Sequence, residues 1–386
     1  MHSEGSLSAA PRRYFAAADI LRILCILLVA WFHIWQQSWL DPSFTLFGHY
    51  FDLQRLVRRG YMTVDLTLVL SGFLLYRPIA GHEGRVGSIP DFYRRRLCRI
   101  LPCYLLAVFT AAILTLFTGR STGSAPLWRD LLTHLTFTHT FSMSTYYWTS
   151  LNGVLWTLAI EMQFYFLFPF LARAFGKRPY LTFSLLTAAA FASRYAAAGA
   201  ENIALFFNQL PCMLDLYALG MLAAHFAEKR SGAEKKWVFL PLAAAALFGT
   251  LWVLWSQHAS DDTEIKLAQL LWRFPLGAFG AAFLYFSSRV PERAERVFGN
   301  RAVRFFGAIS YNFYIWHQYL AVKLKEFHIP DYVSELPQMN EGHAWQLRYT
   351  LICFGAAFVL AAAITYGFEK PVGRALTQIK KKKENI

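Results

Sequence analysis

Long runs of apolar residues, separated by short polar segments, dominate this sequence. Each run approaches the roughly 20 residues that an α-helix needs to cross a bilayer. The pattern predicts ten membrane-spanning helices, at about residues 14–35, 61–76, 100–117, 154–175, 180–198, 203–226, 237–255, 267–286, 305–324 and 347–368. A moderately apolar stretch at 128–141 contains His134 and His139, and it predicts a re-entrant or interfacial helix. The expected fold class is therefore all-α, in a polytopic integral membrane protein.

The distribution of charge supports this topology. The chain of 386 residues is 56% hydrophobic and only 16% charged, whereas soluble domains usually have about a quarter charged residues. Its net charge of +14 comes from Lys and Arg residues that cluster in alternate segments between the predicted spans. By the positive-inside rule these segments face the cytoplasm, and so do both chain termini. This distribution explains the high net charge. The expected partner is therefore the lipid bilayer, and no nucleic-acid partner is expected.

The expected organisation is a membrane domain at 1–372 followed by a basic cytoplasmic tail at 373–386. The first apolar run is too long and too charged for a cleaved signal peptide. Five cysteines lie in or beside apolar runs, and their spacing is not that of metal ligands. We interpret them as packing residues and expect no metal.

The first predicted span carries three ionisable residues, Asp19, Arg22 and His33. Because a helix turns by about 100° per residue, Arg22 and His33 return to within about 20° of the same face, and Asp19 lies within about 40° of it. Charged residues inside a membrane helix are costly and usually face a cavity or a partner. Two interpretations are open: an Asp19–Arg22 pair that holds this helix to a neighbour, or a functional stripe that includes His33.

A dense group of arginines precedes the third span, in the stretch DFYRRRLCRILPCY. Arg96 and Arg99 are three positions apart and share a helix face, while Arg94 and Arg95 lie beside them. Guanidinium groups bind phosphates through two parallel hydrogen bonds, so the group suits a phosphate-rich ligand. The alternative is ordinary anchoring to acidic lipid headgroups, worth about 1 kcal/mol per charge.

The fourth span contains Glu161, at a depth where it can meet His33. An imidazole beside a carboxylate in a cavity of low dielectric constant is a competent general base. The alternative for Glu161 is a buried carboxylate that joins helices by hydrogen bonds. Interhelical hydrogen bonding is also the simpler interpretation for the other polar residues within spans: Asp215, Ser310, Tyr311, Asn312, His317 and Gln318.

Seven motifs in this order resemble the acyltransferase-3 family of membrane acyltransferases, which modify bacterial cell-surface and secreted glycans. The resemblance covers nearly the whole chain. It rests on Arg22 with His33, VDLTLVLSGFLL (64–75), YRRRLCRILPCY (93–104), LWTLAIEMQFYFLFP (155–169), MLDLYALGMLAA (213–224), SYNFYIWHQ (310–318) and FEKP (368–371).

The resemblance implies transfer of an acyl group, most often acetyl, from cytoplasmic acyl-CoA to a carbohydrate hydroxyl, in the bacterial cytoplasmic membrane. In this interpretation Arg94, Arg95, Arg96 and Arg99 hold the phosphates of CoA, and Arg22 leads toward the reacting centre. His33, helped by Glu161, deprotonates the acceptor or carries the acyl group itself. The distance from the arginines to His33 leaves two routes open, a pantetheine arm that threads into the bundle or an intermediate step. A separate glycan-modifying protein either completes the transfer or is not needed.

Two other classes of function compete with this hypothesis. Charges inside the membrane also mark ion-coupled secondary transporters and glycan exporters. The cytoplasmic Arg-x-x-Arg and binding of acyl-CoA distinguish a transferase from a transporter. A membrane scaffold for another enzyme is the third class, and it predicts that substitution of His33 has no effect.

Overall fold

The computed structural model describes residues 14–119, 123–229, 235–257 and 262–384 of the chain. It is a helical bundle with one two-stranded antiparallel hairpin, formed by β1 (Ser43–Leu46) and β2 (His49–Asp52). The first half contains α1 (Ala16–Ser38), α2 (Gln54–Arg58), α3 (Thr63–Tyr76), α4 (Ile89–Thr118), α5 (Leu127–Leu135), α6 (Met143–Tyr146), α7 (Trp156–Lys177) and α8 (Pro179–Ala198). The second half contains α9 (Ile203–Phe207), α10 (Leu214–Lys229), α11 (Phe239–Ser256), α12 (Asp262–Ser287), α13 (Glu292–Phe298), α14 (Arg301–Glu326), α15 (Pro337–Asn340), α16 (Gly342–Ile364) and α17 (Lys370–Glu384).

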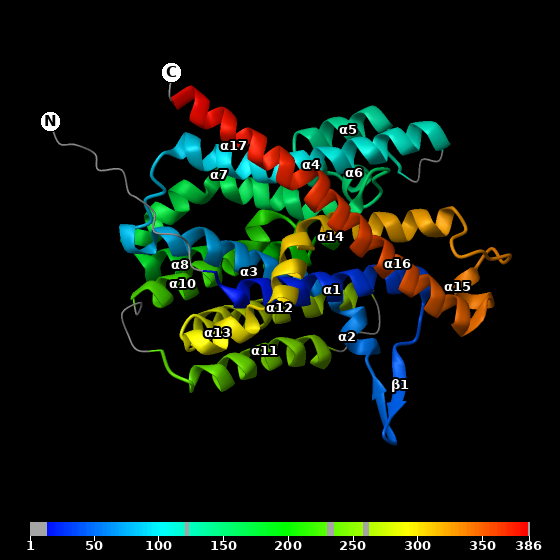
Figure 1. Ribbon diagram of the computed structural model, residues 1–386, viewed down its shortest axis with the longest axis horizontal. Helices are drawn as coiled ribbons and strands as arrows, with labels where there is room; N and C mark the ends of the chain where they lie inside the picture. The colour runs from blue at the N-terminus through cyan, green and yellow to red at the C-terminus, as the bar shows by residue number, and fades with distance from the viewer. Residues whose placement is uncertain (1–13, 120–122, 230–234, 258–261, 385–386) are drawn as a thin grey trace.

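The long helices run side by side, and successive ones reverse direction, except that α17 continues the line of α16 (Figure 1). We call the end where α4 begins and α7 ends the basic end, because Arg85, Arg94, Arg173 and Lys177 lie there. The hairpin and α15 lie at the opposite end, which we call the hairpin end. Since α1 begins and α17 ends toward the basic end, the described chain enters and leaves the bundle on the same side.

The prediction of an all-α polytopic membrane protein is confirmed. Eight helical segments within the described residues are long and apolar enough to cross a membrane. Two further helices, α8 with 20 residues and α14 with 26, occupy the predicted fifth and ninth spans but are more polar. The stretch predicted as re-entrant or interfacial forms α5 and a 3₁₀ turn at His139–Phe141. The pattern of apolar residues did not predict the β-hairpin.

The predicted sixth span differs, because the chain is broken there into α9, a 3₁₀ turn at Leu210–Met213 and α10. Pro211 has no N–H to donate within a helix. The carbonyl of Phe207 instead accepts a hydrogen bond from Arg273 Nη1 at 3.0 Å, and the carbonyl of Cys212 accepts one from Arg194 Nε at 2.9 Å. Side chains from distant segments therefore satisfy the backbone at the break.

Glycines allow α3 and α10 to approach until their backbones touch. A Cβ atom at Gly72 would overlap the carbonyl of Tyr217, and one at Gly220 would overlap the carbonyl of Val69. Close packing of small residues is the usual basis of helix association in membranes, where lipid provides little hydrophobic driving force. The pair forms the centre of the apolar core.

Two buried ion pairs join further helices to this centre. Arg273 Nε of α12 lies 2.9 Å from Asp65 Oδ2 of α3, and Arg194 of α8 pairs with Asp215 of α10. All four side chains are at most 2% exposed. Removal of one partner from such a pair leaves an uncompensated charge, so these pairs fix the arrangement of the helices. For Asp215, the interpretation as an interhelical contact is confirmed.

Candidate active site

The polar stripe of α1 begins with a group of contacts near the basic end. Arg22 Nη1 lies 2.6 Å from Asp19 Oδ1, and the Tyr14 hydroxyl donates to Asp19 Oδ2 at 2.8 Å. Gly307 of α14 lies against the same carboxylate, because a Cβ there would be 2.5 Å from Asp19 Cγ. The predicted Asp19–Arg22 pair is thus present, and it also touches a neighbouring helix.

Glu161 of α7 lies deeper in the bundle, between α3 and the charged group on α1. It accepts a hydrogen bond from the Ser71 hydroxyl, and it interacts with the hydroxyl of Tyr165 one turn further along α7. Arg22 is within electrostatic range of Glu161 and of Arg99 as well as of Asp19. Glu161 therefore belongs to a charged group that α1, α4 and α7 share.

His33 lies nearer the hairpin end of α1, beside His317 of α14. The centres of the two imidazole rings are 5.3 Å apart. His33 Nδ1 is 2.9 Å from Gln36 Oε1, and His317 Nδ1 is 2.6 Å from the Tyr314 carbonyl oxygen. Because an oxygen of this type only accepts, Nδ1 is the protonated nitrogen in each ring, and Nε2 keeps a free electron pair.

His317 Nε2 is buried and has no hydrogen-bond partner among the described residues. A buried polar atom without a partner costs free energy, and in native structures it often marks a place that a substrate or water completes. A buried nitrogen without a partner among those residues, His317 Nε2, therefore lies on the ring next to His33, where α1 and α14 pack together.

The structure does not bring His33 and Glu161 together directly. Within the described part of the chain no hydrogen bond or ion pair joins them, since His33 contacts Gln36 and His317 whereas Glu161 contacts Ser71. The imidazole nearest to His33 comes from α14. From the sequence alone, His317 was interpreted as a residue of interhelical contacts, and its position beside His33 becomes visible only when α1 and α14 are packed together.

The arginines of α4 divide between two faces of that helix. A cavity of about 500 Å³ at the basic end is lined by Arg94, Arg95 and Arg99, and by Glu369 and Lys370 from the junction of α16 and α17. Arg96 points elsewhere, with its guanidinium 5.5 Å from the ring centre of Phe92 and 5.8 Å from that of Tyr165. Three of the four predicted phosphate-binding arginines thus share one cavity.

Tyr165 links this arginine group to the interior of the bundle. Its hydroxyl is in electrostatic contact with Arg96, Arg99 and Glu161. The chain of polar groups from the arginine-lined cavity thus continues through Tyr165 and Glu161 to Arg22. Along α1, His33 lies about 16 Å beyond Arg22, at about 1.5 Å per residue.

A second route from the cavity leads into α14. Glu369, which lines the cavity, accepts a hydrogen bond from Asn312 Nδ2 at 2.6 Å. Asn312 precedes His317 by five residues on the same helix, so α14 reaches both the cavity and the imidazole pair. The motifs SYNFYIWHQ and FEKP, distant in sequence, meet at this hydrogen bond.

The arrangement can support a proton transfer at one end and phosphate binding at the other. Imidazole nitrogens near neutral pH accept protons from hydroxyl groups, and clustered guanidinium groups bind phosphates. The polar groups between them are held on five helices, α1, α3, α4, α7 and α14. The described residues contain no group of three or more His, Cys, Asp or Glu side chains placed to hold a metal ion.

The sequence matches a known protein family and several curated relatives. A family model described as an acyltransferase domain matches residues 15–367. The O-acetyltransferase OatA of Staphylococcus aureus strain NCTC 8325 / PS 47 is 24% identical over 343 residues, which cover 82% of this chain and 52% of that relative. OatA of strains COL and MRSA252 matches to the same extent. The chain spans about half the length of these curated relatives, and no solved structure matches it significantly.

Proposed function

The chain belongs to the acyltransferase-3 family, and from that premise we propose that it moves an acyl group from acyl-CoA to a hydroxyl of a cell-surface or secreted carbohydrate. The relatives that it matches are named O-acetyltransferases, so we propose acetyl as the group and acetyl-CoA as the donor. Those relatives are bacterial, and the chain is a multi-pass membrane protein, so we place it in the bacterial cytoplasmic membrane.

The observation that best supports this function is a path of polar groups that begins at a cavity lined with arginines and ends at Arg22, on the helix that also carries His33 of the imidazole pair. A transporter has no need of a phosphate-binding cavity at the end of such a path. We assign the basic end to the cytoplasm, by the excess of Lys and Arg there. The donor then reaches Arg94, Arg95 and Arg99 from the side where acyl-CoA is made.

These arginines, with Lys370, fit the phosphates of CoA by charge and by number of donors. Each guanidinium can form charge-assisted hydrogen bonds worth about 1.5–3 kcal/mol. Glu369 also lines the cavity. Its carboxylate accepts a hydrogen bond from Asn312 Nδ2. We propose that Arg96, which packs on the ring of Tyr165, holds that side chain in position and does not bind the phosphates.

In the chemical step that we propose, the acceptor hydroxyl gives its proton to Nε2 of His33 or His317. The acceptor oxygen forms a new bond to the acyl carbonyl carbon, the carbon–sulfur bond of the thioester breaks, and the thiolate of CoA takes up a proton. Transfer through His33 itself, in two such displacements, uses the same groups. Arg22, ordered by Asp19, and Glu161 provide charges along the path.

The test uses membrane vesicles that contain the wild type or His33→Ala at matched protein levels. Acetyl-CoA labelled in its acetyl group is supplied, and base-labile label on glycan is measured. The proposal predicts label with the wild type and none with His33→Ala. Equal label from both would remove His33 from the mechanism, and wild-type vesicles that bind no acyl-CoA and transfer no label would favour the transporter.

A further inference from the structure

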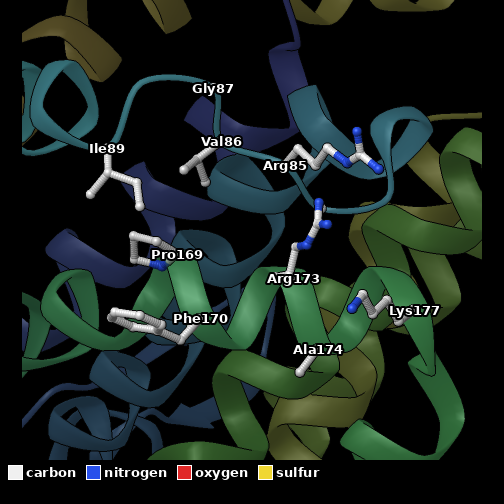
Figure 2. A pocket seen from close by; sticks show the side chains of 10 residues that line it. Arg85, Val86, Gly87, Ile89, Pro169, Phe170, Arg173, Ala174 and Lys177 are labelled. Carbon is white, nitrogen blue, oxygen red and sulfur yellow. The ribbon is translucent and has the colours of Figure 1, made fainter.

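A second and larger cavity, of about 670 Å³, opens at the basic end away from the arginine group of α4. It lies between the loop that precedes α4 and the last turns of α7 (Figure 2). The residues used in the proposed acyl transfer do not line it. We call it the α7 cavity; its lining includes Arg85, Ile89, Phe170, Arg173 and Lys177.

The lining of the α7 cavity changes from apolar to cationic along α7. Figure 2 shows Val86, Ile89, Pro169 and Phe170 on one side, and Arg85, Arg173 and Lys177 on the other. Phe166, Phe170, Arg173 and Lys177 follow each other at spacings of four, three and four residues, so they form one stripe on the helix. Both phenylalanines are more than 60% exposed. This stripe is apolar toward the middle of the span and cationic at its basic end.

The cations of the α7 cavity are available to a ligand. Among the described residues, no carboxylate lines the cavity. Arg85 pairs only at the surface, with Glu83 at 3.2 Å, while Arg173 and Lys177 form no ion pair with a carboxylate among the described residues. The side chain of Arg173 extends from α7 toward the loop that carries Arg85 (Figure 2).

Tight backbone contacts hold the two walls of the cavity together. Gly84 has a φ of +71°, and a Cβ there would overlap the carbonyl of Ala172 on α7. A Cβ at Gly176 would overlap the carbonyl of Glu83 from the other side. The loop is therefore seated on α7 by close approach of backbones, which only glycine permits at these positions. Both walls of the cavity are therefore fixed in position by the fold.

We propose that the α7 cavity binds one anionic phospholipid, with its phosphate headgroup against Arg85, Arg173 and Lys177 and an acyl chain along Phe170 and Phe166. Phe170 and Lys177 are seven residues apart, or about 10 Å along the helix. That distance is comparable with the depth from the headgroup to the first part of the hydrocarbon region, since headgroups add about 5–8 Å to each face of the bilayer core. A soluble phosphate would use the cations but would make no contact with the apolar part of the stripe.

Binding to this site is tested with purified full-length protein in neutral detergent, by native mass spectrometry during titration with phosphatidylglycerol or phosphatidylcholine. The cavity variant is Arg173→Gln/Lys177→Gln. The matched control is Arg178→Gln/Arg301→Gln, which removes two exposed charges from the same end of the bundle but outside the cavity. We expect about 10-fold or more weaker binding of phosphatidylglycerol by the cavity variant, from about 1 kcal/mol per basic residue, and less than a 2-fold change in the control.

A third variant separates a lipid from a soluble phosphate compound. Phe170→Gln should weaken binding of phosphatidylglycerol while it leaves any binding of glycerol phosphate unchanged. The proposal is overturned if the control pair loses as much affinity as the cavity pair, if the cavity pair binds phosphatidylglycerol like the wild type, or if glycerol phosphate or CoA competes as well as the lipid. Equal melting temperatures of all variants in lipid-free detergent would confirm that the variants are folded.

Discussion

The contact between Gly307 and Asp19 offers a direct test of whether Arg22 must be held in place. Asp19 binds Arg22 at 2.6 Å, and Gly307 of α14 packs on the back of that carboxylate. In Gly307→Ala, the new Cβ would lie 2.5 Å from Asp19 Cγ and 2.8 Å from Asp19 Cβ. Carbon atoms in contact are normally about 3.5–4.0 Å apart, so Asp19 or the helix must move by about 1 Å or more.

The expected effect on stability is modest, whereas the expected effect on activity is large. Overpacking of this kind costs about 1–3 kcal/mol, and Ala regains up to about 1 kcal/mol over Gly within a helix. The net destabilisation is thus about 0–3 kcal/mol. A misplacement of about 1 Å in a positioning group can reduce rates by roughly 100-fold. We therefore expect kcat/KM for acetyl transfer to fall by 10-fold or more in protein that remains folded.

The assay compares Gly307→Ala with Gly355→Ala, each measured for label transfer at matched protein level and for melting temperature. Gly355 is exposed on α16 and has open space where a Cβ would be placed, so Gly355→Ala should retain activity and melt at the same or a higher temperature. Wild-type kcat/KM in Gly307→Ala would refute the role of the Asp19–Arg22 contact. An equal loss in Gly355→Ala would show that the assay responds to any helix substitution.

Three other substitutions test separate parts of the account. His317→Gln, which keeps a polar side chain but removes the basic Nε2, should lower kcat by about 100-fold with little change in KM; unchanged kcat in the transfer assay would exclude His317 from proton transfer. Arg99→Gln should weaken acetyl-CoA binding by about 10-fold or more in a direct binding measurement, whereas Arg178→Gln should leave it unchanged; equal effects would mean that only overall charge matters. Gly220→Ala should lower the melting temperature because α10 must move away from α3, in contrast to Gly355→Ala, and a melting temperature equal to the wild type would contradict the backbone contact.

The sequence predicted local features more reliably than contacts between distant segments. The spacing of Asp19 and Arg22 predicted their ion pair, because residues three apart on one helix are neighbours. The same rule placed Arg96 and Arg99 on one face, and both approach Tyr165, but only Arg99 lines the cavity. A side chain as long as arginine can turn toward a neighbouring aromatic ring, which helix geometry does not determine.

The features that the sequence did not predict depend on contacts between helices that are distant in the chain. His317 lies 284 positions after His33, and only the packing of α14 on α1 brings the two rings together. The break after Phe207 depends on Arg273, which arrives from another helix. The apolar run at 203–226 contained Pro211 as a signal of that break. The division of the chain at 372 and the roles of His33, Glu161, Arg22 and the arginine group stay predictions.

The proposed function requires an acyl group to enter from the basic side and to reach an acceptor on the other side. It is tested most directly with sealed vesicles of opposite orientation, given labelled acetyl-CoA only on the outside. We predict label on glycan in inverted vesicles, in which the basic end faces the donor, and none in right-side-out vesicles until these are made permeable. Equal label in intact right-side-out vesicles, or label in inverted vesicles that contain His33→Ala, would contradict the account.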